Sequence, residues 1–315
     1  MRASGSSPAS AVSPAPAPTA VTDASTVRTL LVHGMIAGLL AGLCAFLPAY
    51  AAGEPPVRDS IALEETRSAA SAHEPSAHEP SAHEPSAHEP SAHGAAAHGA
   101  AAPEQKEEEA EEELVSRPVQ STFGLATGVL VYGVAIGGIA SLVFAVSLGR
   151  TGRFRPRTTA ALVAGAAFTT VCLVPFLKYP ATPPAVGNPD TIGKRTALFF
   201  LMIALSVLLA VIAVIVGRRL APRLGNWSAS VVAGGGYVLA VVVACLVLPA
   251  NSDAVAADFP AALLWEFRLA SLGVQALLWT AFGLIFGALA ERALAERAPA
   301  ERAPAPSRDA VRPAP

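Results

Sequence analysis

Hydrophobic residues gather in six long runs, and polar or proline-rich stretches separate these runs. Each run holds about 20 mainly apolar residues, the length that a helix needs to cross a hydrocarbon core of about 30 Å. The runs cover roughly residues 29-51, 123-148, 159-177, 196-217, 228-249 and 268-290. The pattern therefore predicts an all-α fold, a polytopic transmembrane helical bundle of about six spans.

The end of the first run allows an alternative. Ala49-Tyr50-Ala51 places small residues two positions apart, as at a signal-peptidase site. Cleavage there would leave five spans and would not alter the remaining topology. A signal peptide seldom follows so long and so nearly uncharged an N-terminal arm, so we favour an intact first span.

Composition agrees with a membrane protein, because 52% of the 315 residues are hydrophobic and only 15% are charged. Ordinary soluble domains have about 25% charged residues. The formal net charge of -2 hides a segregation of sign along the chain. Residues 52-122 contain 15 acidic residues, whereas 149-158 contain four arginines and no acid.

The charge pattern predicts the orientation of the bundle. Short loops rich in Lys and Arg stay in the cytoplasm, which places 149-158, 218-227 and the tail after residue 290 inside. Arg28 places the N-terminus there too. The loops 52-122, 178-195 and 250-267 then face outward, although Lys178, Lys194 and Arg195 oppose the rule in the middle one. We expect a multi-pass protein of the plasma membrane with both termini in the cytoplasm.

Five regions follow from these patterns. They are a disordered cytoplasmic arm (1-28), the first span (29-51), an extracytoplasmic loop rich in His, Glu and Pro (52-122), a five-span bundle (123-290) and a disordered cytoplasmic tail (291-315). The long loop contains the repeat Ser-Ala-His-Glu-Pro over residues 71-99. Proline at every fifth position prevents a continuous helix, so we predict an extended, mobile chain for the repeat.

The repeat supplies candidate metal ligands, because imidazole nitrogen is the commonest side-chain ligand for transition metals. The six histidines of the loop are His73, His78, His83, His88, His93 and His98. Neighbouring imidazoles are about 15 Å apart in an extended chain, so chelation requires the loop to fold back. The alternative is an expanded low-complexity linker without ligands. Imidazoles would favour nickel, copper or zinc over cobalt, so selectivity must arise elsewhere.

Outside this loop the chain has one histidine, His33, near the inner end of the first span. We favour a neutral, hydrogen-bonded histidine over an ion-pathway ligand. The cysteines Cys44, Cys172 and Cys245 each lie alone within a span. Without the close pairing of thiolate sites, they are predicted to be small hydrophobic residues.

Two outer segments have features of a binding site with a defined conformation and differ from ordinary connecting loops. Five prolines stiffen residues 175-196, and the segment 258-268 leads into the last span. Candidate residues for a pathway or its mouth are His33, Lys178, Tyr179, Asn188, Asp258, Glu266 and Arg268. For Glu266 and Arg268, a structural ion pair or an interface anchor is the first interpretation and a cation entrance is the second.

Glycines recur at four-residue spacing within the spans, at Gly34, Gly38 and Gly42, at Gly124 and Gly128, at Gly133 and Gly137, and at Gly283 and Gly287. Such ridges let helix backbones approach closely in lipid, which predicts a compact bundle. The alternative is that glycine is simply abundant here.

The motifs of common enzymes are absent from the sequence. It has no His-Glu-x-x-His zinc motif, no nucleophile elbow and no dinucleotide-binding fingerprint. We expect no enzymatic activity, no permanently bound cofactor and no nucleic-acid partner.

The outer segments carry a family resemblance. The run Pro-Phe-Leu-Lys-Tyr-Pro-Ala-x-Pro-Pro-Ala-Val-Gly (175-187), the following 191-196, and Leu-Trp-x-Phe-Arg-Leu-Ala-Ser-Leu-Gly-Val-Gln (264-275) strongly resemble the CbtA family of probable cobalt transporter subunits. Residues 117-128 look similar to the start of that family's second span. The resemblance implies import of cobalt(II) for corrinoid synthesis, together with a small single-span, histidine-bearing CbtB-like companion subunit.

A divalent metal uptake component is therefore the predicted function, with cobalt(II) as substrate. The alternative from a different class is a non-transporting membrane scaffold or metal-sensing accessory that presents the histidine loop to a partner.

Overall fold

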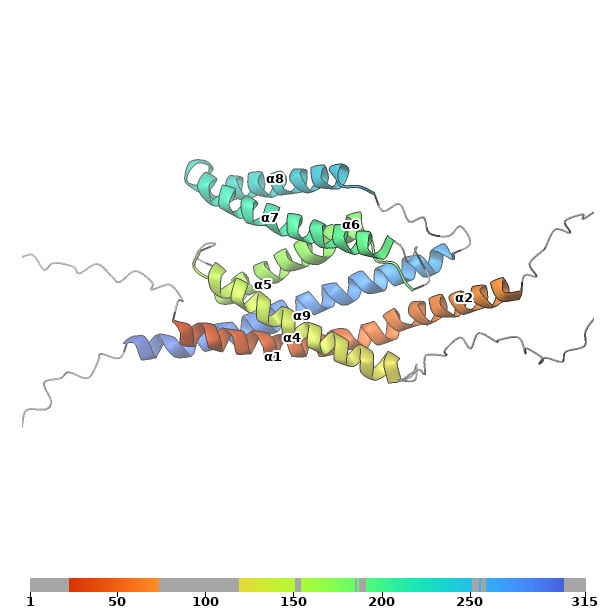
Figure 1. Cartoon of the computed structure of the whole chain (residues 1–315). Helices are drawn as coiled ribbons and strands as arrows, with labels where there is room; N and C mark the ends of the chain where they lie inside the picture. The colour runs from red at the N-terminus through yellow and green to blue at the C-terminus, as the bar shows by residue number, and fades with distance from the viewer. Residues whose placement is uncertain are drawn as a thin grey trace, which may run out of the picture.

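The computed structural model describes residues 23–73, 119–150, 154–184, 186, 191–250, 255 and 259–302. Every regular element in this part of the chain is helical (Figure 1). In the N-terminal half the elements are α1 (Ala24–Pro48), η1 (Ala49–Gly53), α2 (Glu54–His73), η2 (Gln120–Gly124) and α4 (Leu125–Ser147). They are followed by α5 (Pro156–Ala167), η3 (Phe168–Leu173), α6 (Val174–Lys178), α7 (Ile192–Leu224), α8 (Asn226–Val247) and α9 (Ala261–Arg302).

The predicted fold class is confirmed. Six helical segments are long and apolar enough to cross a membrane, namely Ala24–Ala69, Thr122–Ser147, Pro156–Lys178, Ile192–Leu224, Asn226–Val247 and Ala261–Arg297. Each contains nearly all of one predicted span. Their length and composition are those of a multi-pass membrane protein.

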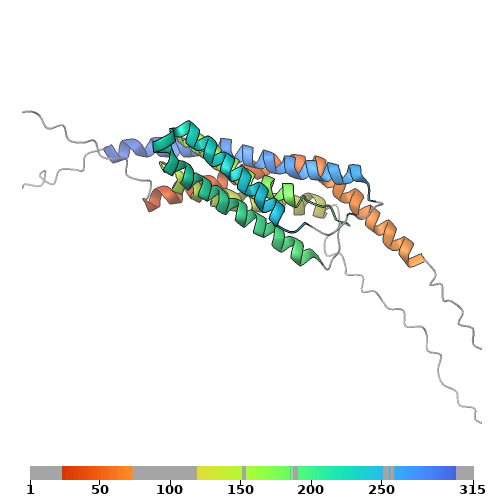
Figure 2. The same cartoon turned by 90° about the horizontal axis from the view of Figure 1, so that it is seen from above.

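Four of the spans form the main bundle. Helix α1 packs along α4, and α9 lies against both α1 and α5. The hairpin of α7 and α8 stands to one side and meets the bundle through η3 and α6 (Figures 1 and 2). Phe144, Phe282 and Phe286 form the centre of the main core, whereas Met202 and Tyr179 belong to a smaller core at the base of the hairpin.

Glycines allow α1 and α4 to touch backbone to backbone. A Cβ atom added to Gly137 would lie 2.9 Å from the Cα of Gly38, and one added to Gly42 would lie 3.0 Å from the carbonyl oxygen of Val129. Gly283 and Gly287 let α9 approach α5 in the same way, 2.9 Å from the Ala164 Cβ at the first position. The predicted glycine ridges are confirmed at these positions but not at Gly128, where an added Cβ would meet nothing within 4 Å. Close backbone approach of this kind favours helix association in lipid through van der Waals packing.

Helix α1 does not end where the apolar run ends. It passes through the π-helical turn η1 into α2, so residues 54–73, at the start of the predicted loop, are helical. Pro55 and Pro56 have no backbone N–H to donate to the preceding turn. The π-helical turn η1 lies just before them and is wider than an α-helical turn, so the helix continues without these two hydrogen bonds. The same pairing recurs at η3, which precedes Pro175. Helix α2 extends the first helix by about 30 Å.

One end of the bundle is held by arginines, and we call it the arginine end (Arg157, Glu291 and Arg297). Arg297 of α9 donates to the hydroxyls of Ser25 and Thr29, at 3.0 and 2.6 Å, and to the Ser25 carbonyl. Arg157 at the start of α5 forms an ion pair with Glu291. The opposite end carries residues 179–186 and the start of α9, and we call it the loop end.

Candidate functional site

Three of the predicted mouth residues come together at the loop end. The Arg268 Nε donates a hydrogen bond to the carbonyl oxygen of Ala181 at 3.3 Å, which ties α9 to the proline-rich segment. The Lys178 ammonium lies 5.8 Å from the centre of the Tyr179 ring. Glu266 is exposed and forms no ion pair with Arg268 in the described part of the chain. Arg268 is therefore an anchor of the loop end through a backbone carbonyl.

Tyr179 connects the loop end to the hairpin. Its side chain is buried, and its hydroxyl donates a hydrogen bond of 2.8 Å to the carbonyl oxygen of Pro249, just beyond α8. Burial, followed by the nearby Cys245, raises the pKa of this phenol above its ordinary value. The phenol is thus held in its neutral, donating form.

We predict that Tyr179→Phe lowers the free energy of unfolding by about 1 kcal/mol, because the part-buried hydrogen bond from the Tyr179 hydroxyl to the Pro249 carbonyl is lost. The measurement is thermal unfolding in detergent, with Tyr50→Phe as the control, since Tyr50 is 41% exposed. Equal melting temperatures for the two variants would contradict the proposed anchor.

The other predicted ligands are not brought to this site by the described residues. Asn188 and Asp258 lie outside them, as do His78, His83, His88, His93 and His98. His73 is the last residue of α2. The histidine loop therefore stays a prediction.

His33 lies towards the arginine end. Its Nδ1 donates a hydrogen bond of 2.9 Å to the Thr29 carbonyl one turn earlier in α1. This bond is the hydrogen-bonded state that we favoured for His33. It also leaves Nε2 with its lone pair available when the ring is neutral.

A buried carboxylate that the sequence did not single out lies at the junction of η1 and α2. Glu54 is 7% exposed, and its Oε1 lies 3.8 Å from the Nε of Arg58 one turn later. Carboxylates are seldom fully buried unless they are paired or bind a cation. Because η1 packs against α9, this carboxylate is held at the loop-end side of the main bundle.

A polar cluster lies deeper between three spans. Cys172 of η3 donates a hydrogen bond of 3.7 Å from its thiol to the Oε1 of Gln275 on α9. The Tyr132 hydroxyl of α4 lies beside both of these side chains. The indole of Trp279, one turn after Gln275, lies near the same thiol. We call these four residues the Cys172 cluster.

The position of the cluster in the bundle follows from α9. Gln275 lies two turns beyond Arg268, about 10 Å along the helix axis. Beyond Trp279 comes an aromatic stack, in which the ring centres of Phe282 and Phe286 are 5.2 Å apart and those of Phe286 and Phe144 are 5.0 Å apart. The cluster thus lies between the loop end and this aromatic stack.

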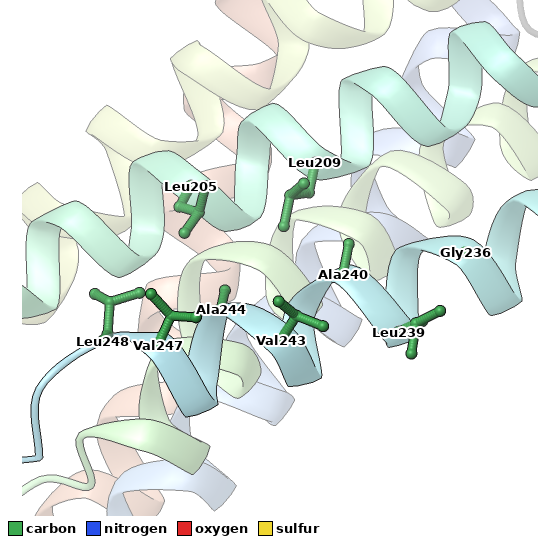
Figure 3. Close-up of a pocket in the computed structure, with 9 residues that line it drawn as sticks. All are labelled: Leu205, Leu209, Gly236, Leu239, Ala240, Val243, Ala244, Val247 and Leu248. Carbon is green, nitrogen blue, oxygen red and sulfur yellow. The ribbon is translucent and has the colours of Figure 1, made fainter.

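A groove on the hairpin has different chemistry. It measures about 510 Å³ and lies between α7 and α8, where Leu205 and Leu209 of one helix face Ala240 and Ala244 of the other (Figure 3). Its lining contains only aliphatic side chains and Gly236. Such a surface suits lipid chains or an apolar helix and offers no ligand to a metal ion.

Sequence reasoning missed Glu54 and the Cys172 cluster. Gln275 is the only glutamine inside the predicted last span, and Glu54 is the first charged residue after the first apolar run. A single polar residue in or beside an apolar span can indicate a functional site, so both residues could have been predicted from the sequence. Cys172 gave none, because its partners lie in other helices.

Comparison with known proteins gives one match. A family model described as probable cobalt transporter subunit (CbtA) matches residues 27–291. No curated protein and no solved structure matches the chain. The matched range begins in α1 and ends in α9, so it covers the whole bundle.

Proposed function

The chain belongs to the CbtA family, and from this premise we propose that it is the membrane component through which a divalent metal, cobalt(II) in particular, enters the cell. The family description identifies a subunit of a cobalt transporter. The observation that carries the proposal is the succession of polar groups in an otherwise apolar bundle. Glu54 is buried where η1 meets α2, and the Cys172 cluster lies about 10 Å from Arg268 along α9.

The loop end is the outer mouth in this proposal. The positive-inside rule supports it, because Arg157, Arg218, Arg223 and Arg297 lie at or beyond the other ends of the spans. Lys178, Tyr179, Asn188, Asp258, Glu266 and Arg268 then frame the mouth, and His33 lies deeper, toward the cytoplasm. The histidine loop of residues 71-99 would gather cations above the mouth.

Two finer proposals concern the cellular role. The imported cobalt would supply corrinoid synthesis, and a small single-span, histidine-bearing companion would complete the transporter. We expect no enzymatic activity and no permanently bound cofactor, because the polar groups described above suit passage of an ion and include no candidate nucleophile with its base.

The test is metal uptake in cells that lack other importers. With the gene present, cellular cobalt is expected to rise several-fold during corrinoid starvation, and nickel and zinc are measured in parallel. Deleting residues 71-99 should reduce uptake at limiting cobalt and have little effect at saturating cobalt, because the loop only concentrates the ion. Removal of residues 303-315, which follow α9, is the control.

The competing candidate is a scaffold or metal sensor that presents the histidine loop to a partner. It predicts equal cobalt uptake with and without the gene. It also predicts that deletion of residues 71-99 abolishes the partner's response at every cobalt concentration. Equal uptake with and without the gene would remove the uptake proposal.

A further inference from the structure

We propose that the Cys172 cluster is an intramembrane binding site for the transported metal, in which the thiolate of Cys172 and the amide oxygen of Gln275 coordinate a divalent transition metal. This inference rests on the proposed function and deepens it, because it names the ligands of one site in the pathway. None of the four residues was a predicted site residue.

The first observation is the convergence of ligand atoms. The Cys172 Sγ and the Gln275 Oε1 are 3.7 Å apart although they come from different spans, and the Tyr132 hydroxyl stands beside them. Two ligands of one metal ion at bond lengths of about 2.0–2.3 Å are separated by about this distance in a tetrahedral arrangement. Sulfur, amide oxygen, phenol oxygen and one water molecule would complete four positions.

The second observation is independent of the cysteine. Trp279 is only 4% exposed, and its Nε1 has no hydrogen-bond partner among the residues that the structure describes. A buried donor without an acceptor costs about 1–3 kcal/mol and calls for a physical explanation. The indole lies near the Cys172 thiol, whose neutral sulfur is a weak acceptor.

Metal binding explains why the Trp279 indole N–H has no hydrogen-bond partner among the described residues. Coordination breaks the S–H bond and forms a metal–sulfur bond, and the displaced proton passes to water at the loop end. The sulfur then carries negative charge and becomes a strong acceptor for the Trp279 N–H, as in the outer shell of other metal sites. The charge of the bound dication in turn offsets the cost of a thiolate in an apolar medium. The Trp279 N–H would therefore stabilise the thiolate form of Cys172, which is the form in the metal-bound state.

The surroundings suit a transient site. The π-helical turn η3 places Cys172 on the side facing α9, and π-helical turns often mark functional positions. A cavity of about 230 Å³ between α5 and α9 borders Trp279, and its lining is mainly apolar. The described residues contain no group of three or more His, Cys, Asp and Glu side chains that could hold a metal. Coordination by a single thiolate would bind the metal ion weakly. A transport pathway requires such weak binding, because the bound ion must also dissociate from the site.

The experiment uses the full chain in detergent, titrated with cobalt(II) chloride alone. Cobalt bound to a thiolate has a near-ultraviolet charge-transfer band, which cobalt bound to the histidine loop lacks. The band is expected in the native chain and in a Cys44→Ser/Cys245→Ser variant that keeps only Cys172. It should be lost in Cys172→Ser, and Gln275→Leu should weaken the apparent affinity about tenfold. Trp279→Phe, which keeps an aromatic ring, should also weaken it.

A second measurement does not depend on how Cys172→Ser folds. In the variant that keeps only Cys172, cobalt(II) should slow alkylation of the thiol by a maleimide at least several-fold. No band in the native chain, a band that persists in Cys172→Ser, or alkylation unaffected by cobalt would each overturn the site. Cobalt uptake is measured in parallel. Uptake without the band would refute the site and keep the transporter, whereas a band without uptake would keep the site and refute the transporter.

Discussion

Replacing Gly137 with leucine is expected to prevent the bundle from assembling. A Cβ atom at this position would lie 2.9 Å from the Cα and 3.1 Å from the N of Gly38. Both atoms belong to the backbone of α1, so no rotamer change can relieve the overlap, and the two helices must move apart. Overpacking usually costs about 1–3 kcal/mol. A displaced helix pair should cost at least about 3 kcal/mol, which is a large share of the usual stability of a protein.

The control for this variant is Gly128→Leu in the same helix, because a Cβ at Gly128 meets nothing within 4 Å. The measurement is the yield of monodisperse protein on size-exclusion chromatography in detergent. We expect at least a tenfold loss for Gly137→Leu, a smaller loss for Gly137→Ala and the native yield for Gly128→Leu. Equal yields for the two leucine variants would show that α1 and α4 do not pack through this glycine seam.

Replacing Glu54 with glutamine is expected to reduce cobalt uptake at limiting metal about tenfold. The two side chains have nearly the same shape, so the change removes the charge and keeps the packing. A dication about 5 Å from a carboxylate gains about 7 kcal/mol at an effective dielectric constant of 20. If only a fifth of this attraction survives desolvation, the remaining 1.4 kcal/mol corresponds to a factor of ten.

Two further variants separate this role of Glu54 from a structural one. Glu64→Gln changes an exposed acid in the same helix and should leave uptake unchanged. Arg58→Ala removes the only ion-pair partner that the described residues provide for Glu54. If Glu54 attracts the metal, Arg58→Ala keeps or raises uptake, because a competing positive charge is gone. If uptake falls equally in Arg58→Ala and Glu54→Gln, the carboxylate serves the fold.

The sequence predicted several residues of the mouth but none of the Cys172 cluster. The proline-rich segment 175-196 contains Lys178 and Tyr179, and the segment 258-268 ends with Arg268. The composition of these two segments was enough to predict the three residues as part of the mouth. Their actual roles, a ring contact and hydrogen bonds to the carbonyls of Pro249 and Ala181, depend on long-range pairing. Cys172, Gln275 and Tyr132 are spread over three spans, and nothing in their local sequence connects them.

The sequence by itself determined the six spans, the sign of their loops and the spacing of the glycines. These are properties of single segments, because the length of an apolar run and the period of a helix need no partner. The tertiary structure alone decided that α1 continues into α2, that Glu54 is buried and that one thiol, one amide and one unpaired indole share a site. Such facts depend on which helix faces meet, and in lipid that choice follows from packing over the whole bundle.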